Sequence, residues 1–166
     1  PSLNVERADW QRGRHPEIVA WLNRVHGDGA MLCSACSGVL LIAETGLLAG
    51  HDVTMHPAYA ATFRSNFPDV RLRLDETLVA SGDRGELVTA GASASWHDLV
   101  LYLVARRRES GDRVTTCPET RKTAVVRLDA GHAAWTDLRG EKELRLESCS
   151  RWPERADCGR ECLREV

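Results

Sequence analysis

The hydrophobic pattern divides the first two thirds of the chain into alternating helices and strands. Apolar residues at helical spacing predict a helix that opens at Pro16 and stops at Gly27. An apolar run over 30–35 predicts a strand buried on both faces, and a buried helix follows over 39–44. Further elements are expected at 52–55, 57–66, 70–74, 78–80, 87–89 and 98–105. This alternation predicts an α/β layer fold.

The pattern changes after Ala105. Residues 106–166 hold 12 of the 20 arginines and four of the six cysteines, and they contain no Phe, Tyr, Ile, Met, Asn or Gln. Their apolar residues show no clear helical or strand periodicity, and no turn residues mark off separate elements. We therefore expect a domain over 1–106 and an irregular tail over 107–166. A second hypothesis is that the tail is not the native continuation, because a reading-frame slip in a GC-rich gene would give such an excess of Arg, Cys and Trp.

Charge and hydropathy limit the partners. The chain has 22 basic and 24 acidic residues and a net charge of -2, which excludes a strongly basic nucleic-acid surface. The longest apolar runs, 39–43 and 99–105, are far shorter than the roughly 20 residues of a membrane span. The start of the chain carries no signal-peptide pattern. We expect a cytoplasmic protein with reduced cysteines, no membrane association and no cofactor.

The chemistry concentrates where the first predicted strand meets the next helix. Cys36 lies at this junction, with small residues two positions to either side, Ser34 and Gly38. This pattern is typical of a nucleophile elbow, in which a tight turn presents the central side chain at the carboxyl end of the sheet. The following helix would stabilise a thiolate at Cys36, and the amides of Ser37 and Gly38 could form an oxyanion site. A buried structural cysteine is the competing interpretation.

Two histidines are candidate partners of the cysteine. His56 closes a predicted strand and is the candidate base, although a structural hydrogen-bonding role competes. His97 adjoins Asp98 and is a candidate pocket residue. A zinc set of His132 with Cys149, Cys158 and Cys162 lacks paired short knuckles, so we expect no metal site.

Several ordered motifs carry a family resemblance over residues 1–106. The segment 33–50 is similar to the elbow region of the PfpI-type, class I glutamine-amidotransferase-like superfamily, above all in the branch fused to AraC-type helix-turn-helix regulators (the GlxA group). Three later segments match further motifs of that branch: Val53–His56, Phe67–Val70 and Thr89–Leu99.

The resemblance implies a flavodoxin-like three-layer sandwich, often dimeric, of which this chain holds the C-terminal half. The family's first half, with an acidic residue that contacts the elbow cysteine in enzymatic members, would precede residue 1. Pro1–Leu3 would then occupy the place of the family's Pro-Gly-Gly loop. DNA would be bound only through a domain beyond this chain.

Two classes of function follow. We favour a ligand-sensing domain, present here as a fragment, of an AraC-type transcription regulator that binds a small molecule near Cys36. The alternative is a cysteine-dependent hydratase, amidase or glyoxalase-like enzyme, in which Cys36 attacks and His56 carries the proton. An inactive fragment is a third option.

Overall fold

The computed structural model describes residues 10–155, 157–164 and 166 and divides the chain into two compact units. Unit 1 is Pro1–Val100 and unit 2 is Leu101–Val166. The boundary lies close to the expected one at residue 106. The expectation for Pro1–Leu3 lies outside the described residues.

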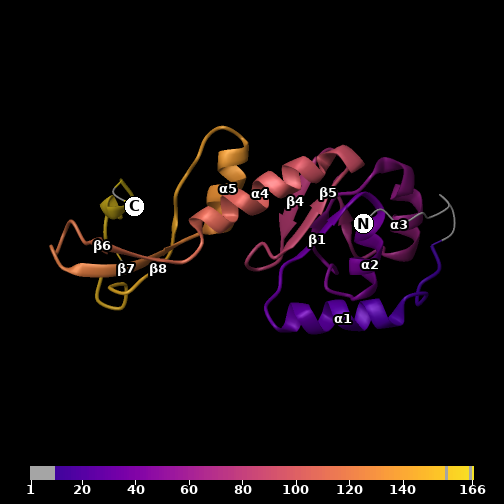
Figure 1. The fold of residues 1–166 in the computed structure, drawn as a ribbon, viewed down its shortest axis with the longest axis horizontal. Helices are drawn as coiled ribbons and strands as arrows, with labels where there is room; N and C mark the ends of the chain where they lie inside the picture. The colour runs from indigo at the N-terminus through magenta and orange to yellow at the C-terminus, as the bar shows by residue number, and fades with distance from the viewer. Residues whose placement is uncertain (1–9, 156, 165) are drawn as a thin grey trace. The chain divides into compact units, whose positions relative to one another are not determined.

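Unit 1 is built on a mixed three-stranded sheet in the order β1-β5-β4 (Figure 1). β1 (Leu32–Ala35) runs parallel to β5 (Leu87–Ala90), and β4 (Leu78–Ser81) pairs with β5 in an antiparallel hairpin. Gly82 and Gly85 take positive φ values of 87° and 62° in the hairpin turn, a conformation that glycine adopts without strain. The elements expected at 78–80 and 87–89 are thus the two strands of this hairpin.

The core of unit 1 is centred on a short helix, α2 (Val39–Glu44), which is buried from Val39 to Ala43. Phe63, Val53 and Leu48 are fully buried in the same cluster. α1 (Pro16–Gly27) has no buried residue and contacts this core through Leu22 and Val25. Nearly continuous apolar sequence explains the burial of α2, whereas α1 has only one apolar stripe.

Shorter elements complete unit 1. β2 (Asp52–Val53) pairs in parallel with β3 (Arg71–Leu72) in a separate two-stranded sheet. A short 3-10 turn, η2 (Pro57–Tyr59), leads into α3 (Ala60–Asn66). The 3-10 turns η1 (Cys36–Gly38) and η3 (Ser93–Ser95) precede α2 and α4 (Trp96–Glu109). The mixed α/β class is confirmed, and the arrangement is compatible with a flavodoxin-like sandwich.

One expectation for the first strand is wrong. β1 was predicted to be buried on both faces, but its residues alternate between buried and half-buried. Leu32 and Ser34 are buried, and Cys33 and Ala35 are only partly covered. Among the described residues β1 is an edge strand whose only partner is β5, so one of its faces receives less cover.

Unit 2 is ordered where the sequence predicted an irregular tail. Its antiparallel sheet has the order β6-β7-β8, with strands Asp112–Thr116, Thr123–Leu128 and Leu146–Cys149. α5 (Ala130–Leu138) lies between β7 and β8 in sequence, and η4 (Glu161–Arg164) lies near the end. The prediction of an irregular tail is therefore wrong for 112–149. The signal it missed is the alternation of β7, which buries every second residue: Ala124, Val126 and Leu128.

An ion-pair cluster ties three segments of unit 2 together. The buried carboxylate of Glu109, at the end of α4, accepts hydrogen bonds from Lys142 Nζ at 2.6 Å and from an Arg113 guanidinium nitrogen at 2.8 Å. The hydrogen bond from Lys142 is the main cause that lowers the pKa of Glu109 below its ordinary value. The hydrogen bond from Arg113 lowers it further, whereas burial opposes both. The cluster joins α4 to β6 and to the loop before β8.

No helix among the described residues combines the length and the apolar character required to cross a bilayer.

We expect Leu40→Ala to lower the free energy of unfolding of unit 1 by about 2–5 kcal/mol, because Leu40 is fully buried and the substitution leaves a cavity. Val100→Ala is the control, since that side chain also belongs to unit 1 and is 45% exposed, and it should change stability by no more than about 0.5 kcal/mol. Urea unfolding followed by amide hydrogen exchange measures both. Equal losses in the two variants would contradict this packing.

We expect unit 2 to lose stability in acid through Glu109. The pKa of this carboxylate is lowered in the folded state, so its contribution is complete above the pKa of an unfolded glutamate, about 4.3, and disappears as pH falls through the lowered value. Hydrogen exchange in β6–β8 between pH 7 and pH 3 measures this. Glu109→Gln should remove that part of the pH dependence, and Glu147→Gln, at an exposed position, should not.

Candidate functional site

The candidate site begins at a sharp bend between β1 and α2. Cys36 has a positive φ of 59°, in the left-handed region that costs a side-chain-bearing residue about 1–2 kcal/mol. Ala35 before it is extended, and Gly38 after it is already helical. We call this segment, residues 35–39, the Cys36 bend. The chain changes from strand to helix within it, and strain of this kind clusters at functional sites.

The Cys36 bend is closely packed and contains polar groups. Cys36 is 7% exposed, and Ser37 and Gly38 are buried beside it. On β1, Ser34 is 4% exposed, and its hydroxyl has no hydrogen-bond partner among the described residues. A buried hydroxyl of this kind ordinarily has a partner, so Ser34 is an unsatisfied polar group beside the bend.

Strand register brings two further segments to the edge where Cys36 lies. Ala35 is opposite Ala90 in the parallel β1–β5 pair, so the residues that follow both strands leave the sheet at the same edge. The backbone N–H of Thr54 donates to Thr89 Oγ1 at 2.8 Å, which attaches the segment after β2 to β5. His56 lies two residues beyond Thr54 and is thereby carried to this edge.

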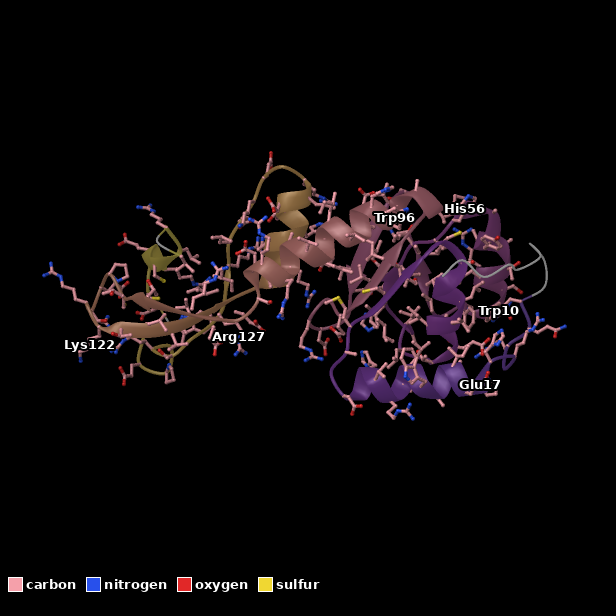
Figure 2. All side chains as sticks on the ribbon, in the orientation of Figure 1. Trp10, Glu17, His56, Trp96, Lys122 and Arg127 are labelled. Atoms are coloured by element: carbon pink, nitrogen blue, oxygen red, sulfur yellow. The ribbon has the colours of Figure 1, made fainter. Side chains whose placement is uncertain are left out.

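The segment after β5 supplies an exposed aromatic pair at the start of α4. The N–H of Gly91 donates to the carbonyl of Thr77 at 2.8 Å, which holds the chain as it leaves the sheet. The rings of Trp96 and His97 are stacked, with centroids 3.7 Å apart and planes at 30°, and both residues are exposed. Figure 2 shows Trp96 and His56 in the same upper region of unit 1, away from Glu17 on α1. Sequence reasoning treated His97 as a candidate and missed Trp96.

The hydrogen bonds of the two histidines limit their chemistry. His56 Nδ1 accepts from the backbone N–H of Ala58 at 3.1 Å, so in the neutral ring the proton is on Nε2. His97 Nδ1 lies 3.0 Å from the carbonyl oxygen of Ala94, which assigns the proton of its neutral ring to Nδ1. In the described part of the chain neither ring is hydrogen-bonded to Cys36.

These bonds favour binding over proton transfer at His56. A base that acts on the Cys36 thiol through Nε2 needs a free lone pair there, which would require Nδ1 to give up its bond to Ala58. As it stands, His56 offers an N–H donor from Nε2. The ring also contacts Tyr59 edge-on, with centroids 6.1 Å apart, which fixes its orientation. Cys36, Ser37, Gly38 and His56 thus share one edge of the sheet, and His97 is exposed on α4.

The other sequence candidates lie elsewhere. Cys33 is within β1 and half-buried, so it is not at a helix start. His132, expected to join the cysteines of the tail if a metal bound there, is instead 3.0 Å from Glu143 through Nε2.

No known family profile matches the chain. Two curated proteins of Pseudomonas aeruginosa are similar to it. It is 32% identical over 91 residues to the HTH-type transcriptional regulator CdhR, covering 55% of this chain and 26% of CdhR. It is 31% identical over 96 residues to the HTH-type transcriptional regulator GbdR, covering 58% of this chain and 25% of GbdR. The alignments thus span about a quarter of the length of these relatives.

Among solved structures, part of this chain is similar to the crystal structure of a putative transcriptional regulator protein from Vibrio parahaemolyticus. The TM-score is 0.47 at 21% identity, over 54% of this chain and 44% of that one.

At most positions a protein is more stable with alanine than with glycine, and we expect the left-handed backbone at Cys36 to reverse this order of stability. Cys36→Gly and Cys36→Ala both remove the thiol, but only alanine retains the strain, so Cys36→Gly should be more stable by about 1 kcal/mol. At Ala35, where the backbone is extended, Ala35→Gly should instead lose about 0.5–1 kcal/mol relative to the parent chain. Urea unfolding of the three variants measures this. A Cys36→Ala variant more stable than Cys36→Gly would show that the bend is relaxed.

Proposed function

We propose that residues 1–106 are a ligand-sensing, glutamine-amidotransferase-like domain of an AraC-type transcription regulator, with a small molecule bound near Cys36. The similarity to the regulators CdhR and GbdR carries this proposal, because two regulators align with more than half of this chain. The sequence motifs at 33–50, 53–56, 67–70 and 89–99 support the specific branch.

The chemistry of the site supports binding. The Cys36 bend contributes a buried thiol and an unpartnered buried hydroxyl at Ser34, and His56 contributes an N–H donor. A small number of fixed polar groups beside apolar core is typical of a small-molecule site. Trp96 and His97 add a flat, exposed surface at the same end of unit 1.

The regulator hypothesis also assigns the partners. DNA would be contacted by a part of the regulator outside the aligned quarter, and two sensing domains would form a dimer. With 22 basic and 24 acidic residues, the composition of the chain shows no excess of positive charge for contacting DNA.

A cysteine-dependent hydrolase or hydratase is the second candidate, and the left-handed backbone at Cys36 favours it. Nucleophile elbows hold their central residue in such a strained turn. In that case Cys36 would attack as a thiolate, and the amides of Ser37 and Gly38 would stabilise the developing anion.

We expect at least one compound from a panel of amino acids, amines and carboxylic acids to raise the melting temperature of the chain through the Cys36 site. A ligand at 100 times its Kd adds about 2.7 kcal/mol of stability, which is several degrees for a protein of this size. Prior treatment with iodoacetamide should abolish the shift, because the adduct on Cys36 fills the site.

The Cys36→Ala chain given the same treatment is the control, since its other cysteines are modified equally, and it should still respond to the compound. The same proteins are assayed with p-nitrophenyl acetate. Turnover that disappears in Cys36→Ala would establish the enzyme instead. A thermal shift that survives modification of Cys36 would place the ligand elsewhere.

A further inference from the structure

Four cysteines converge in unit 2, far along the chain from the Cys36 bend. Cys117 follows β6, Cys149 ends β8, Cys158 lies in the next loop and Cys162 is in η4. None of the four forms a disulfide in the described structure, and all four line one cavity of about 20 Å³. A void of this size holds one water molecule or one ion. Thiols from four segments therefore surround a single small space.

The fold supplies the convergence that the sequence spacing hides. Cys117 closes the tip of the β6–β7 hairpin, where its N–H donates to the carbonyl of Lys122 at 2.9 Å (Lys122 is labelled in Figure 2). Cys149 is opposite Val126 in the β7–β8 pair. Cys158 and Cys162 are separated by three residues, which is the spacing of a zinc knuckle. Cys158 and Cys162 are thus close in sequence, and the sheet brings Cys117 and Cys149 together.

The remaining lining of the cavity suits thiolate sulfur. Trp152 Nε1 and Arg151 Nε are buried N–H groups without a hydrogen-bond partner among the described residues, and both residues line the cavity. Arg155 adds a second guanidinium. Buried donors require acceptors, and metal-bound thiolates accept such N–H bonds while nearby cations balance their charge.

The buried apolar cluster beside the cavity is small and consists of Val126, Leu128, Leu146 and Cys162. The other buried apolar side chains among the described residues of unit 2 are Tyr102 and three alanines, 124, 133 and 134. Units shorter than roughly 70 residues usually need disulfides or a structural metal in addition to such a core.

We propose that Cys117, Cys149, Cys158 and Cys162 bind one structural zinc ion that joins the β6–β7 turn, the end of β8 and the C-terminal loop. Four thiolates around one ion are typical of structural zinc sites. Within the described residues no three potential ligands already stand at metal-binding spacing, so binding draws the sulfurs inward to about 2.3 Å from the ion. The four thiols release their protons to solvent as zinc binds. Compared with the set considered from sequence, Cys117 replaces His132. The proposal is independent of the function of unit 1.

The test uses the full chain, reduced, incubated with zinc chloride, desalted and analysed for metal by mass spectrometry. We expect one zinc per chain, and cobalt(II) in its place should show thiolate-to-metal charge transfer and the visible bands of a tetrahedral site. Serine at any one of the four positions should weaken zinc binding at least tenfold. Cys33→Ser, a half-buried cysteine of unit 1, should bind as the parent chain does.

A chelator titration of the parent chain separates metal loss from misfolding of a variant. Removing zinc should increase amide hydrogen exchange in β6–β8 and leave β1 and β5 unchanged, and added zinc should restore protection. A reduced parent chain that retains no zinc would overturn the proposal. So would iron in place of zinc, or a chain purified without reductant whose four thiols resist alkylation because they are paired in disulfides.

Discussion

The left-handed backbone of Cys36 is the constraint on which the architecture of unit 1 depends. β1 must end and α2 must begin within a few residues, because α2 is the element that fills the core from Val39 to Ala43. A gentler turn would carry α2 away from the sheet and uncover that core. The strain at one residue is offset by the burial of five apolar positions, each of which contributes on the order of 1 kcal/mol or more. The side chain at the strained position is thereby held at the carboxyl edge of the sheet.

A second set of interactions brings further segments to that edge. Parallel strands end at the same edge, so the residues after β1 and β5 are neighbours for reasons of topology alone. The segment after β2 is not part of this sheet, and the bond from Thr54 N–H to Thr89 Oγ1 provides the attachment. Because the N–H of Thr54 bonds to a side-chain hydroxyl and not to a backbone carbonyl of a neighbouring strand, the residues after Thr54 need not continue as a β-strand. His56 can therefore cap η2 through Nδ1 and direct Nε2–H elsewhere.

Much of unit 1 was predictable from the sequence because local signals and tertiary structure agree there. Pro16 and Gly27 bound α1 as predicted, the apolar run defines α2, and the glycines at 82 and 85 define the hairpin. The tautomer of His56 could not be predicted, because it depends on one hydrogen bond to Ala58. The stacking of Trp96 on His97 depends equally on the rotamers of adjacent side chains. Periodicity carries no information on either.

Unit 2 shows the opposite balance between local and long-range information. Its strands are short, and its arginine-rich composition hides the alternation of β7, so hydrophobic pattern alone indicated a tail. The antiparallel register then brings together residues more than 30 positions apart, such as Cys117 and Cys149. The usual spacing rules for metal ligands expect two pairs of cysteines, each close together in sequence. Here only Cys158 and Cys162 are close in sequence, and the sheet brings Cys117 and Cys149 together. A small unit with few apolar residues gains most from a cross-link between its distant segments, because the entropy of closing a loop grows with loop length. The position of the four thiols, at the hairpin tip, the last strand and the C-terminal loop, is where such a cross-link would restrict the unfolded chain most.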